Sequence, residues 1–298
     1  PHFFGFFRFI IRFQKKMKDM KSMSLLPEEQ MWLQAARSMA RSAGLILKKY
    51  FRRRDLDIED KGNAYDIVTE ADKASERFII NYLHQHFPDH AILSEESGDD
   101  HRAARCQWVI DPLDGTVNYS AGLTTYCVSI GLKVDGQTRL GCVYAPSLDE
   151  EFFAVKGKGA YGPYGRLRVK PTCELNRSVV STGFPYDKAT NPDNNLDRVA
   201  RVMPRVRGLR RLGAAAMDLC YVAAGFLDAY WELNLKEWDA CAGELIAQEA
   251  GAIVDRYRND HGICILAACP GIANDLLTLV VEMQKKNPFS FCISLVLT

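Results

Sequence analysis

Two aspartates lie three positions apart at the end of an apolar segment, in the stretch CQWVIDPLDGTVNYS (106–120). The apolar run 108–110 leads directly into Asp111, and Pro112 disfavours continuation of a central strand. Sheet proteins place functional groups where a strand leaves the core. We therefore expect a turn at Asp111 and expect Asp111 and Asp114 to converge on one point.

The two residues that follow favour anion binding beside these acids. Gly115 and Thr116 are suited to open a helix, and the free N–H groups of a helix start bind anions, phosphate above all. Two carboxylates would repel such an anion unless divalent cations lay between them. The pattern therefore favours metal-dependent phosphate chemistry.

Other acids are spaced along the chain in similar settings. Glu95 and Glu96 end a short apolar run in LSEES, Asp66 opens DIVTEAD, and Asp239 directly precedes a small-residue helix pattern. An all-oxygen ligand set favours Mg²⁺ or Mn²⁺ over zinc. Two such metals can activate a water and stabilise the leaving oxygen of a phosphate ester.

Each of these residues also has a simpler explanation when it is taken alone. A single Asp after a strand is most often a turn or cap residue. Glu70 and Asp72 are expected to be solvated helix residues, and the basic segments 51–54 and 205–211 are more typical of solvated surface than of nucleic-acid binding. No phosphate-loop frame or serine-nucleophile elbow occurs. The spacing alone thus leaves the function open.

The elements that must position these acids indicate an α/β or α+β chain, with antiparallel hairpins in its first half and a change of pattern near residue 175. Helices are expected at 27–51, 70–87, 194–203, from about 213, and at 240–250. Strands are expected at 91–93, 108–110, 125–133, 141–145, 178–183 and 228–233, with a hairpin turn at 134–137.

Composition limits the function classes further. The 298 residues carry a net charge of +1, so charge alone supports neither nucleic-acid nor membrane binding. The nine scattered cysteines suit reduced thiols and a cytoplasmic location. Residues 1–26, rich in aromatic and basic side chains, are expected to be a peripheral extension, with a membrane-surface anchor as the alternative. Residues 283–298 are expected to be a peripheral tail.

The motifs together resemble the inositol monophosphatase family. WVIDPLDGTVNY resembles its first signature and EWDACAGELIAQEAGA (237–252) its second, while DIVTEAD and LSEES resemble two shorter acidic blocks. They occur in the order of the family, and the resemblance covers roughly 28–280. It implies a layered α/β/α/β/α sandwich of the sugar-phosphatase type over 27–282, with two α/β halves that meet near 175. It further implies a homodimer and Mg²⁺-dependent, Li⁺-sensitive hydrolysis of a phosphomonoester.

The resemblance also assigns roles to particular residues. It implies one metal held by Glu95, Asp111 and the Leu113 carbonyl, a second held by Asp111, Asp114 and Asp239, and a third, weaker Mg²⁺ near Glu95, with Mn²⁺ as a substitute. The resemblance further implies that Asp66 and Thr116, with Glu95 nearby, orient and deprotonate the attacking water. It implies that the backbone of Gly115 and Thr116 binds the phosphate. The residues implied to contact the polyol are Gly213, Ala214, Ala215 and Glu232.

Two departures from the family pattern concern the expected site. Val117 stands where a second hydroxyl residue is common and is interpreted as a packing change. Ala121 stands where His or Arg is frequent, near the expected mouth of the site, which bears on the substrate.

The leading hypothesis is hydrolysis of inositol monophosphate, or of a similar small phosphorylated polyol, to the free alcohol and phosphate. It requires no nucleic acid and no membrane. Histidinol phosphate, fructose 1,6-bisphosphate and a 3′-phosphoadenosine phosphate are alternative substrates. A different class of function is also open, in which the chain is a moonlighting module that binds RNA or a protein through its basic segments.

Overall fold

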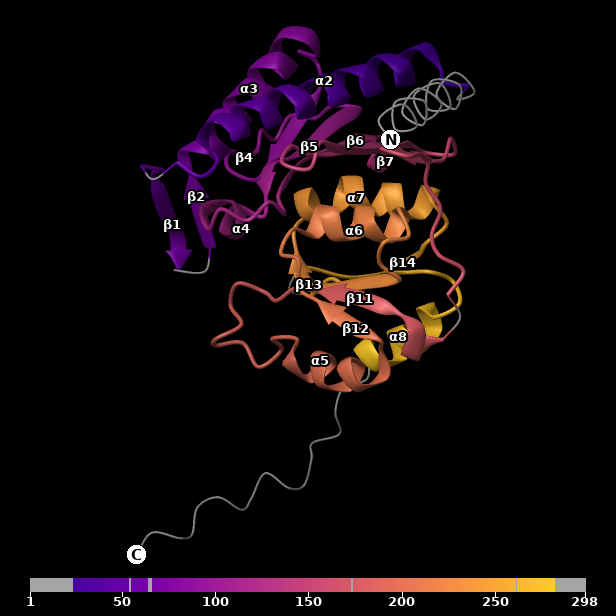
Figure 1. The fold of residues 1–298 in the computed structure, drawn as a ribbon. Helices are drawn as coiled ribbons and strands as arrows, with labels where there is room; N and C mark the ends of the chain where they lie inside the picture. The colour runs from indigo at the N-terminus through magenta and orange to yellow at the C-terminus, as the bar shows by residue number, and fades with distance from the viewer. Residues whose placement is uncertain (1–23, 54, 64–65, 173, 261, 282–298) are drawn as a thin grey trace, which may run out of the picture.

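Five layers of alternating helix and sheet make up the computed structural model, which describes residues 24–53, 55–63, 66–172, 174–260 and 262–281 (Figure 1). Residues 1–23 and 282–298 lie outside the described residues, and so do the expectations for most of the first extension and for the tail. The layering confirms the expected α/β/α/β/α sandwich.

The first layer consists of two long helices, α2 (Pro27–Tyr50) and α3 (Glu70–His86). Apolar residues of α2 such as Trp32, Met39 and Leu47 are buried against one face of the first sheet. Both helices were expected from their three- and four-residue spacing, and they end within a residue of the predicted bounds.

The first sheet has eight strands, all antiparallel to their neighbours except for one parallel pair, β3 with β5. In spatial order the strands are β10 (Gly165–Arg166), β9 (Ala160–Gly162), β8 (Glu150–Val155), β7 (Gln137–Ala145), β6 (Cys127–Val134), β5 (Cys106–Asp114), β3 (Ala91–Ser94) and β4 (Gly98–Asp99). Alternate residues face opposite layers: Ile130 packs toward α2 and α3, while Cys127 packs toward the middle helices.

The middle layer is formed by α6 (Ala215–Ala223) and α7 (Glu237–Glu249), which pack between the two sheets (Figure 1). Gly131 and Gly141 face each other on β6 and β7, directly beneath α7. A methyl group at Gly141 would lie only 2.5 Å from the Ala242 carbonyl oxygen, and backbone cannot yield as a side chain can. The glycine pair therefore allows α7 to approach the sheet closely.

The second sheet has five strands and is covered on its outer face by α5 (Leu196–Val202) and α8 (Ala273–Val281). In spatial order its strands are β12 (Gly208–Arg210), β11 (Val179–Thr182), β13 (Ala229–Leu235), β15 (Ile263–Ala268) and β14 (Ile253–Arg258). All strands of the first sheet precede residue 175 and all strands of the second follow it. Because α6 and α7 share one apolar core with both sheets, the two halves form a single packed unit.

Several short elements complete the described chain. They are the antiparallel pair β1 (Ile58–Asn63) and β2 (Asp66–Thr69), helix α4 (Thr116–Ser120), and the 3-10 turns η1 (Leu175–Arg177) and η2 (Met203–Arg205). The β1–β2 pair was not predicted, because its residues show no clear alternation of apolar and polar side chains. No helix in the part of the chain that the structure describes is long and apolar enough to cross a membrane.

Candidate active site

A β-bulge explains how two aspartates three positions apart can meet. The expectation of a turn at Asp111 is wrong: β5 continues through Pro112 to Asp114. Asp111 pairs with Ser129 and Asp114 with Cys127, so three steps on β5 correspond to two on β6. Residues three apart in a regular strand point to opposite faces, and the extra residue of the bulge brings both carboxyls to one face.

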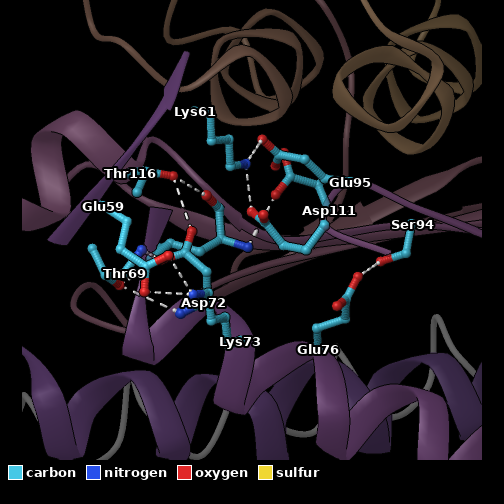
Figure 2. A network of polar contacts seen from close by, with 12 residues as sticks. Glu59, Lys61, Thr69, Asp72, Lys73, Glu76, Ser94, Glu95, Asp111 and Thr116 are labelled. Carbon is cyan, nitrogen blue, oxygen red and sulfur yellow. Dashed lines mark hydrogen bonds and ion pairs between the residues drawn. The ribbon is translucent and has the colours of Figure 1, made fainter. Parts of the chain in front are cut away.

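The parallel pairing of β3 with β5 brings a third acid to the same edge. Ser94 is in register with Ile110, and the Glu95 N–H donates to the Ile110 carbonyl over 3.1 Å. Glu95 therefore follows the end of β3 beside Asp111, at the carboxyl ends of two parallel strands (Figure 2). This adjacency depends on strand order, which the sequence alone does not state.

The second half of the chain supplies the remaining contacts to the acids. The backbone N–H groups of Ala215 and Ala216, at the start of α6, donate to the Asp114 carboxyl over 3.2 and 2.8 Å. Asp239 lies in the first turn of α7, which begins at Glu237 rather than after Asp239 as expected, and its carboxyl accepts the Lys236 N–H over 2.6 Å.

The convergence of these side chains produces a cavity of about 390 Å³. Eleven of the twelve predicted site residues line it: Asp66, Glu95, Asp111, Leu113, Asp114, Gly115, Thr116, Gly213, Ala215, Glu232 and Asp239. The exception is Ala214, which is buried and does not contribute to the lining. The structure thus brings the predicted residues together, while the role of each remains a prediction.

Burial and mutual repulsion perturb the acids strongly. Burial, reinforced by the charges of Glu95, Asp114 and Asp239, raises the pKa of Asp111 well above its ordinary value. Burial also raises the pKa of Asp239 well above its ordinary value and that of Asp114 to about 6, although the amide donors of α6 partly offset the effect at Asp114. Carboxyls in this state favour a compensating cation.

A lysine that the sequence analysis overlooked lies among the acids. Lys61, on β1, donates to Glu95 over 2.9 Å and to Glu96 over 2.6 Å, as Figure 2 shows for Glu95. Its ammonium group is an internal counter-charge for one side of the cluster. Asp111 and Asp114 accept amide N–H groups instead, Asp111 from Leu113 over 3.0 Å.

The donor set fits a hard divalent cation in its chemistry. Within the described ranges, no three carboxyl, imidazole or thiol groups already stand close enough to form a ligand set by themselves. The acids that line the cavity nevertheless offer only oxygen, the donor that Mg²⁺ prefers. Two of them, Asp111 and Asp239, carry strongly raised pKa values that a bound cation would lower.

The partner of Thr116 differs from the predicted one. The Thr116 hydroxyl lies 3.1 Å from an Asp72 carboxyl oxygen and 3.0 Å from the Leu113 carbonyl, and it can donate to either (Figure 2). Asp66 lines the cavity, but no hydrogen bond joins it to Thr116 in the described structure. The direct hydrogen-bond partner of Thr116 is thus Asp72, while the joint role of Asp66 and Thr116 at the cavity stays a prediction.

The expectation that Asp72 is a solvated helix residue is also wrong. Asp72 is fully buried, and its carboxyl accepts the N–H of Thr69 over 2.9 Å as well as the Thr69 hydroxyl. Burial raises the pKa of Asp72 to about 6, partly offset by the Thr69 donors. The sequence signal that could have placed Asp72 in the first turn of α3 is the T-x-x-D spacing of a helix capping box.

The lining of the cavity differs from the expected one at several other residues. Val117 is 43% exposed and lines the cavity, so its interpretation as a packing change is wrong. Ala121 ends α4 and lies outside the lining. Tyr186 and Arg211 contribute to the wall although no motif pointed to them, because they come from a loop and from the residues that follow an edge strand.

Comparison with known proteins gives one family over most of the chain. Residues 28–286 match the Inositol monophosphatase family. A curated relative, Nus factor SuhB of Pasteurella multocida, is 40% identical over 251 residues, which is 83% of this chain and 94% of the relative.

Solved structures agree with this match. The extragenic suppressor protein suhB of Bartonella henselae has a TM-score of 0.78 and 34% identity, covering 85% of this chain and 99% of its own. The inositol monophosphatase of Anabaena has a TM-score of 0.75 and 36% identity, covering 85% of this chain and 96% of its own. The similarity therefore extends over both sheets and the cavity between them.

The raised pKa values predict an unusual pH dependence of stability in the absence of divalent metal. A folded acid with a raised pKa keeps a proton that the unfolded chain releases above about pH 4, so its contribution to stability falls as the pH rises. Asp111→Asn removes one such group and keeps the acceptor for the Leu113 N–H. In urea unfolding with EDTA, the variant should gain about 1–3 kcal/mol over the wild type between pH 5 and pH 8.

The control for this measurement is Asp89→Asn, an exposed acid outside the cavity, which should show no such gain. Added Mg²⁺ at pH 8 should stabilise the wild type and the control far more than Asp111→Asn. An Asp111→Asn protein that is less stable than the wild type at pH 8 in EDTA would contradict the assigned repulsion.

Proposed function

Because this chain belongs to the inositol monophosphatase family, we propose that it is a metal-dependent phosphomonoesterase acting on a small phosphorylated polyol, inositol monophosphate first among them. The observation that carries the proposal is the convergence of Glu95, Asp111, Asp114 and Asp239 on one cavity with Gly115 and Thr116. Bound cations would explain why these repelling carboxyls, two of them buried, are gathered at one cavity.

The acids are the groups that would hold Mg²⁺. Glu95, Asp111 and the Leu113 carbonyl form one candidate ligand set, and Asp111, Asp114 and Asp239 form a second. When bound, such ions lower the pKa of water and neutralise charge on phosphate and on the leaving oxygen. We expect two or three Mg²⁺, with Mn²⁺ as a substitute and Li⁺ as an inhibitor.

Thr116 and Asp72 are the groups placed to handle the attacking water. With Asp72 accepting from Thr69, the Thr116 hydroxyl is held at the cavity wall, where its oxygen can accept a hydrogen bond from water while its proton points to Asp72. A carboxyl with a pKa of about 6 is largely ionised at pH 7.5 and can take up a proton relayed through that hydroxyl. Phosphoryl transfer needs this kind of positioning more than covalent catalysis by the protein.

The remaining wall residues would hold the substrate. Backbone N–H groups of Gly115 and Thr116 are candidates for phosphate, and Gly213, Ala215 and Glu232 for the alcohol. Gly115 has a left-handed backbone, and a Cβ atom added there would lie 2.9 Å from the Thr125 carbonyl oxygen. Both features require a glycine at this position.

A substrate panel tests the proposed reaction. With Mg²⁺ titrated, the purified full chain should release phosphate from myo-inositol 1-phosphate faster than from histidinol phosphate, fructose 1,6-bisphosphate or 3′-phosphoadenosine 5′-phosphate. Li⁺ should inhibit, and Asp111→Asn should lower kcat by at least about a thousandfold because a predicted bridging ligand is lost. Faster turnover of another ester in the panel would make that ester the assigned substrate. Phosphate release without divalent metal would overturn the mechanism.

The Asp72–Thr116 pair predicts that substitution of Asp72 lowers kcat more than substitution of Asp66 does. Asp72→Asn and Thr116→Val should each lower kcat by about 10²–10⁴-fold, and the double variant should be little worse than either, because the two act as one unit. Asp66→Asn should reduce kcat less than Asp72→Asn does. An Asp66→Asn loss larger than that of Asp72→Asn would restore the Asp66–Thr116 pairing.

A second function is supported by the relatives named Nus factor and by one surface of the chain. The basic segment 205–211 lies at η2 and at β12, the edge strand of the second sheet, and Arg205, Arg207, Arg210 and Arg211 are exposed there. We propose RNA as the partner of this surface, because the exposed guanidinium groups of neighbouring arginines suit a phosphate backbone. Of these arginines, only Arg211 also lines the acid cavity.

This binding function has a specific experimental signature. Binding of single-stranded RNA should weaken linearly in log Kd against log salt, and Arg207→Ala with Arg210→Ala should reduce the slope by about 1–2. The matched control Asp239→Ala should bind RNA as the wild type does while losing phosphatase activity. Absence of salt-dependent RNA binding by the wild type would overturn the second function.

A further inference from the structure

We propose that Gly183 and Tyr230 are positioning residues that hold the Glu232 carboxyl as a fixed, specificity-determining acceptor for a hydroxyl group of the substrate alcohol. The inference rests on the proposed phosphatase function and deepens it. Glu232 was expected to contact the polyol, but nothing in the sequence motifs indicates what holds its carboxyl in place.

Tyr230 occupies one of the two carboxyl oxygens. Its ring is fully buried on β13, and its hydroxyl donates to Oε2 of Glu232 over 2.6 Å. Adjacent strand residues normally point to opposite faces, so a hydrogen bond between residues two apart joins side chains on the same face. The Tyr230 bond fixes the orientation of the carboxyl and leaves it further acceptor sites, on Oε1 above all, for a hydroxyl that enters the cavity that Glu232 lines.

Gly183 provides the space in which the carboxyl lies. A Cβ atom at this position would stand 2.0 Å from Oε1 and 2.1 Å from both Cδ and Oε2 of Glu232. The backbone of Gly183 does not have a positive φ, so its conformation is open to any residue. The three atoms nearest to such a Cβ all belong to the Glu232 carboxyl, which therefore excludes a side chain there.

The backbone at Gly183 is held so that it cannot retreat. Asn195, itself buried, donates to the Gly183 carbonyl over 2.6 Å and accepts the indole N–H of Trp231 over 2.8 Å. Thr182 donates to the Trp231 carbonyl over 2.7 Å. These bonds tie the end of β11 to the residue next to Glu232, so an added methyl group must displace the carboxyl and not the chain.

The arrangement selects for a substrate with a hydroxyl near its phosphate. Burial raises the pKa of Glu232 to about 7, while the Tyr230 hydrogen bond and the charge of Arg211 favour the ionised, accepting form of that carboxyl. A site built around a buried acceptor rejects an alcohol that lacks the hydroxyl more strongly than an apolar wall would, because the acceptor is left unpaired. The expected ligand class is therefore a phosphate ester of a vicinal polyol rather than of a simple phenol or alkyl alcohol.

The test compares two esters on the full chain with Mg²⁺: myo-inositol 1-phosphate, which carries ring hydroxyls, and p-nitrophenyl phosphate, which carries none on its leaving group. Gly183→Ala should lower the selectivity for the inositol ester, taken as the ratio of kcat/KM values, by about 10–100-fold. Tyr230→Phe should lower it by about tenfold, the effect of one hydrogen bond to a charged group.

Two further variants separate positioning from damage to the fold. Gly208→Ala also adds a methyl group to a strand of the second sheet, where the three nearest atoms all belong to the flexible end of Arg210, and it should keep the wild-type selectivity. Combining Gly183→Ala with Glu232→Asp shortens the acid by one methylene and should recover part of the lost selectivity. Thermal unfolding of each variant reports whether the fold is intact.

The outcomes are distinguishable. Loss of selectivity in Gly183→Ala with partial recovery in the double variant supports the inference. Equal losses on both esters, or unchanged selectivity in both Gly183→Ala and Tyr230→Phe, overturns it while leaving the phosphatase proposal intact. A wild-type protein that hydrolyses neither ester with Mg²⁺ overturns the phosphatase proposal and the inference with it.

Discussion

Repulsion among buried carboxyls is the constraint around which this protein is organised. Asp111 and Asp114 are buried and Asp239 is half-buried; all three line one cavity, and their pKa values are raised by burial and by neighbouring carboxylates. Neutral backbone amide donors hold all three in place, and the ammonium group of Lys61 compensates the Glu95 and Glu96 side. Such an arrangement is expected to destabilise the fold locally when no cation is bound, and its oxygen donors are of the kind that a small, hard cation prefers.

The acids and their supports come from both halves of the chain, so the site exists only when the two sheets are packed together. Asp111 and Asp114 belong to the first sheet, whereas the amides that hold Asp114 belong to α6 and Asp239 belongs to α7. The helices can lie this close to the first sheet because glycines face them. Gly141 against Ala242 is the clearest example, since any side chain there would meet backbone atoms. Packing density between layers therefore sets the geometry of the acids.

The two proposed functions use surfaces of opposite charge. The cavity collects carboxyls, while exposed arginines follow the outer edge of the second sheet at β12. Arg211 stands at the junction, because it lines the cavity and also ends the basic segment. Apart from Arg211, the residues proposed for the two functions are different, so one chain could serve as a hydrolase and as a binding partner.

The sequence by itself determined the two long helices and the set of acids, because apolar periodicity and short signatures depend only on neighbouring residues. The five-layer architecture was implied by the resemblance of those signatures to the inositol monophosphatase family, and periodicity alone gave only a mixed α/β chain. Local spacing also predicted the Asp135–Gly136 turn, where both residues have positive φ. Tertiary structure alone decided which acids meet: the bulge at Pro112, the parallel register of β3 on β5 and the burial of Asp72 all arise from contacts between distant segments. The roles of Lys61 and Gly183 were also decided by tertiary structure alone. A charge partner or a close contact depends on the distance between residues in space, which the spacing of residues along one strand or helix does not predict.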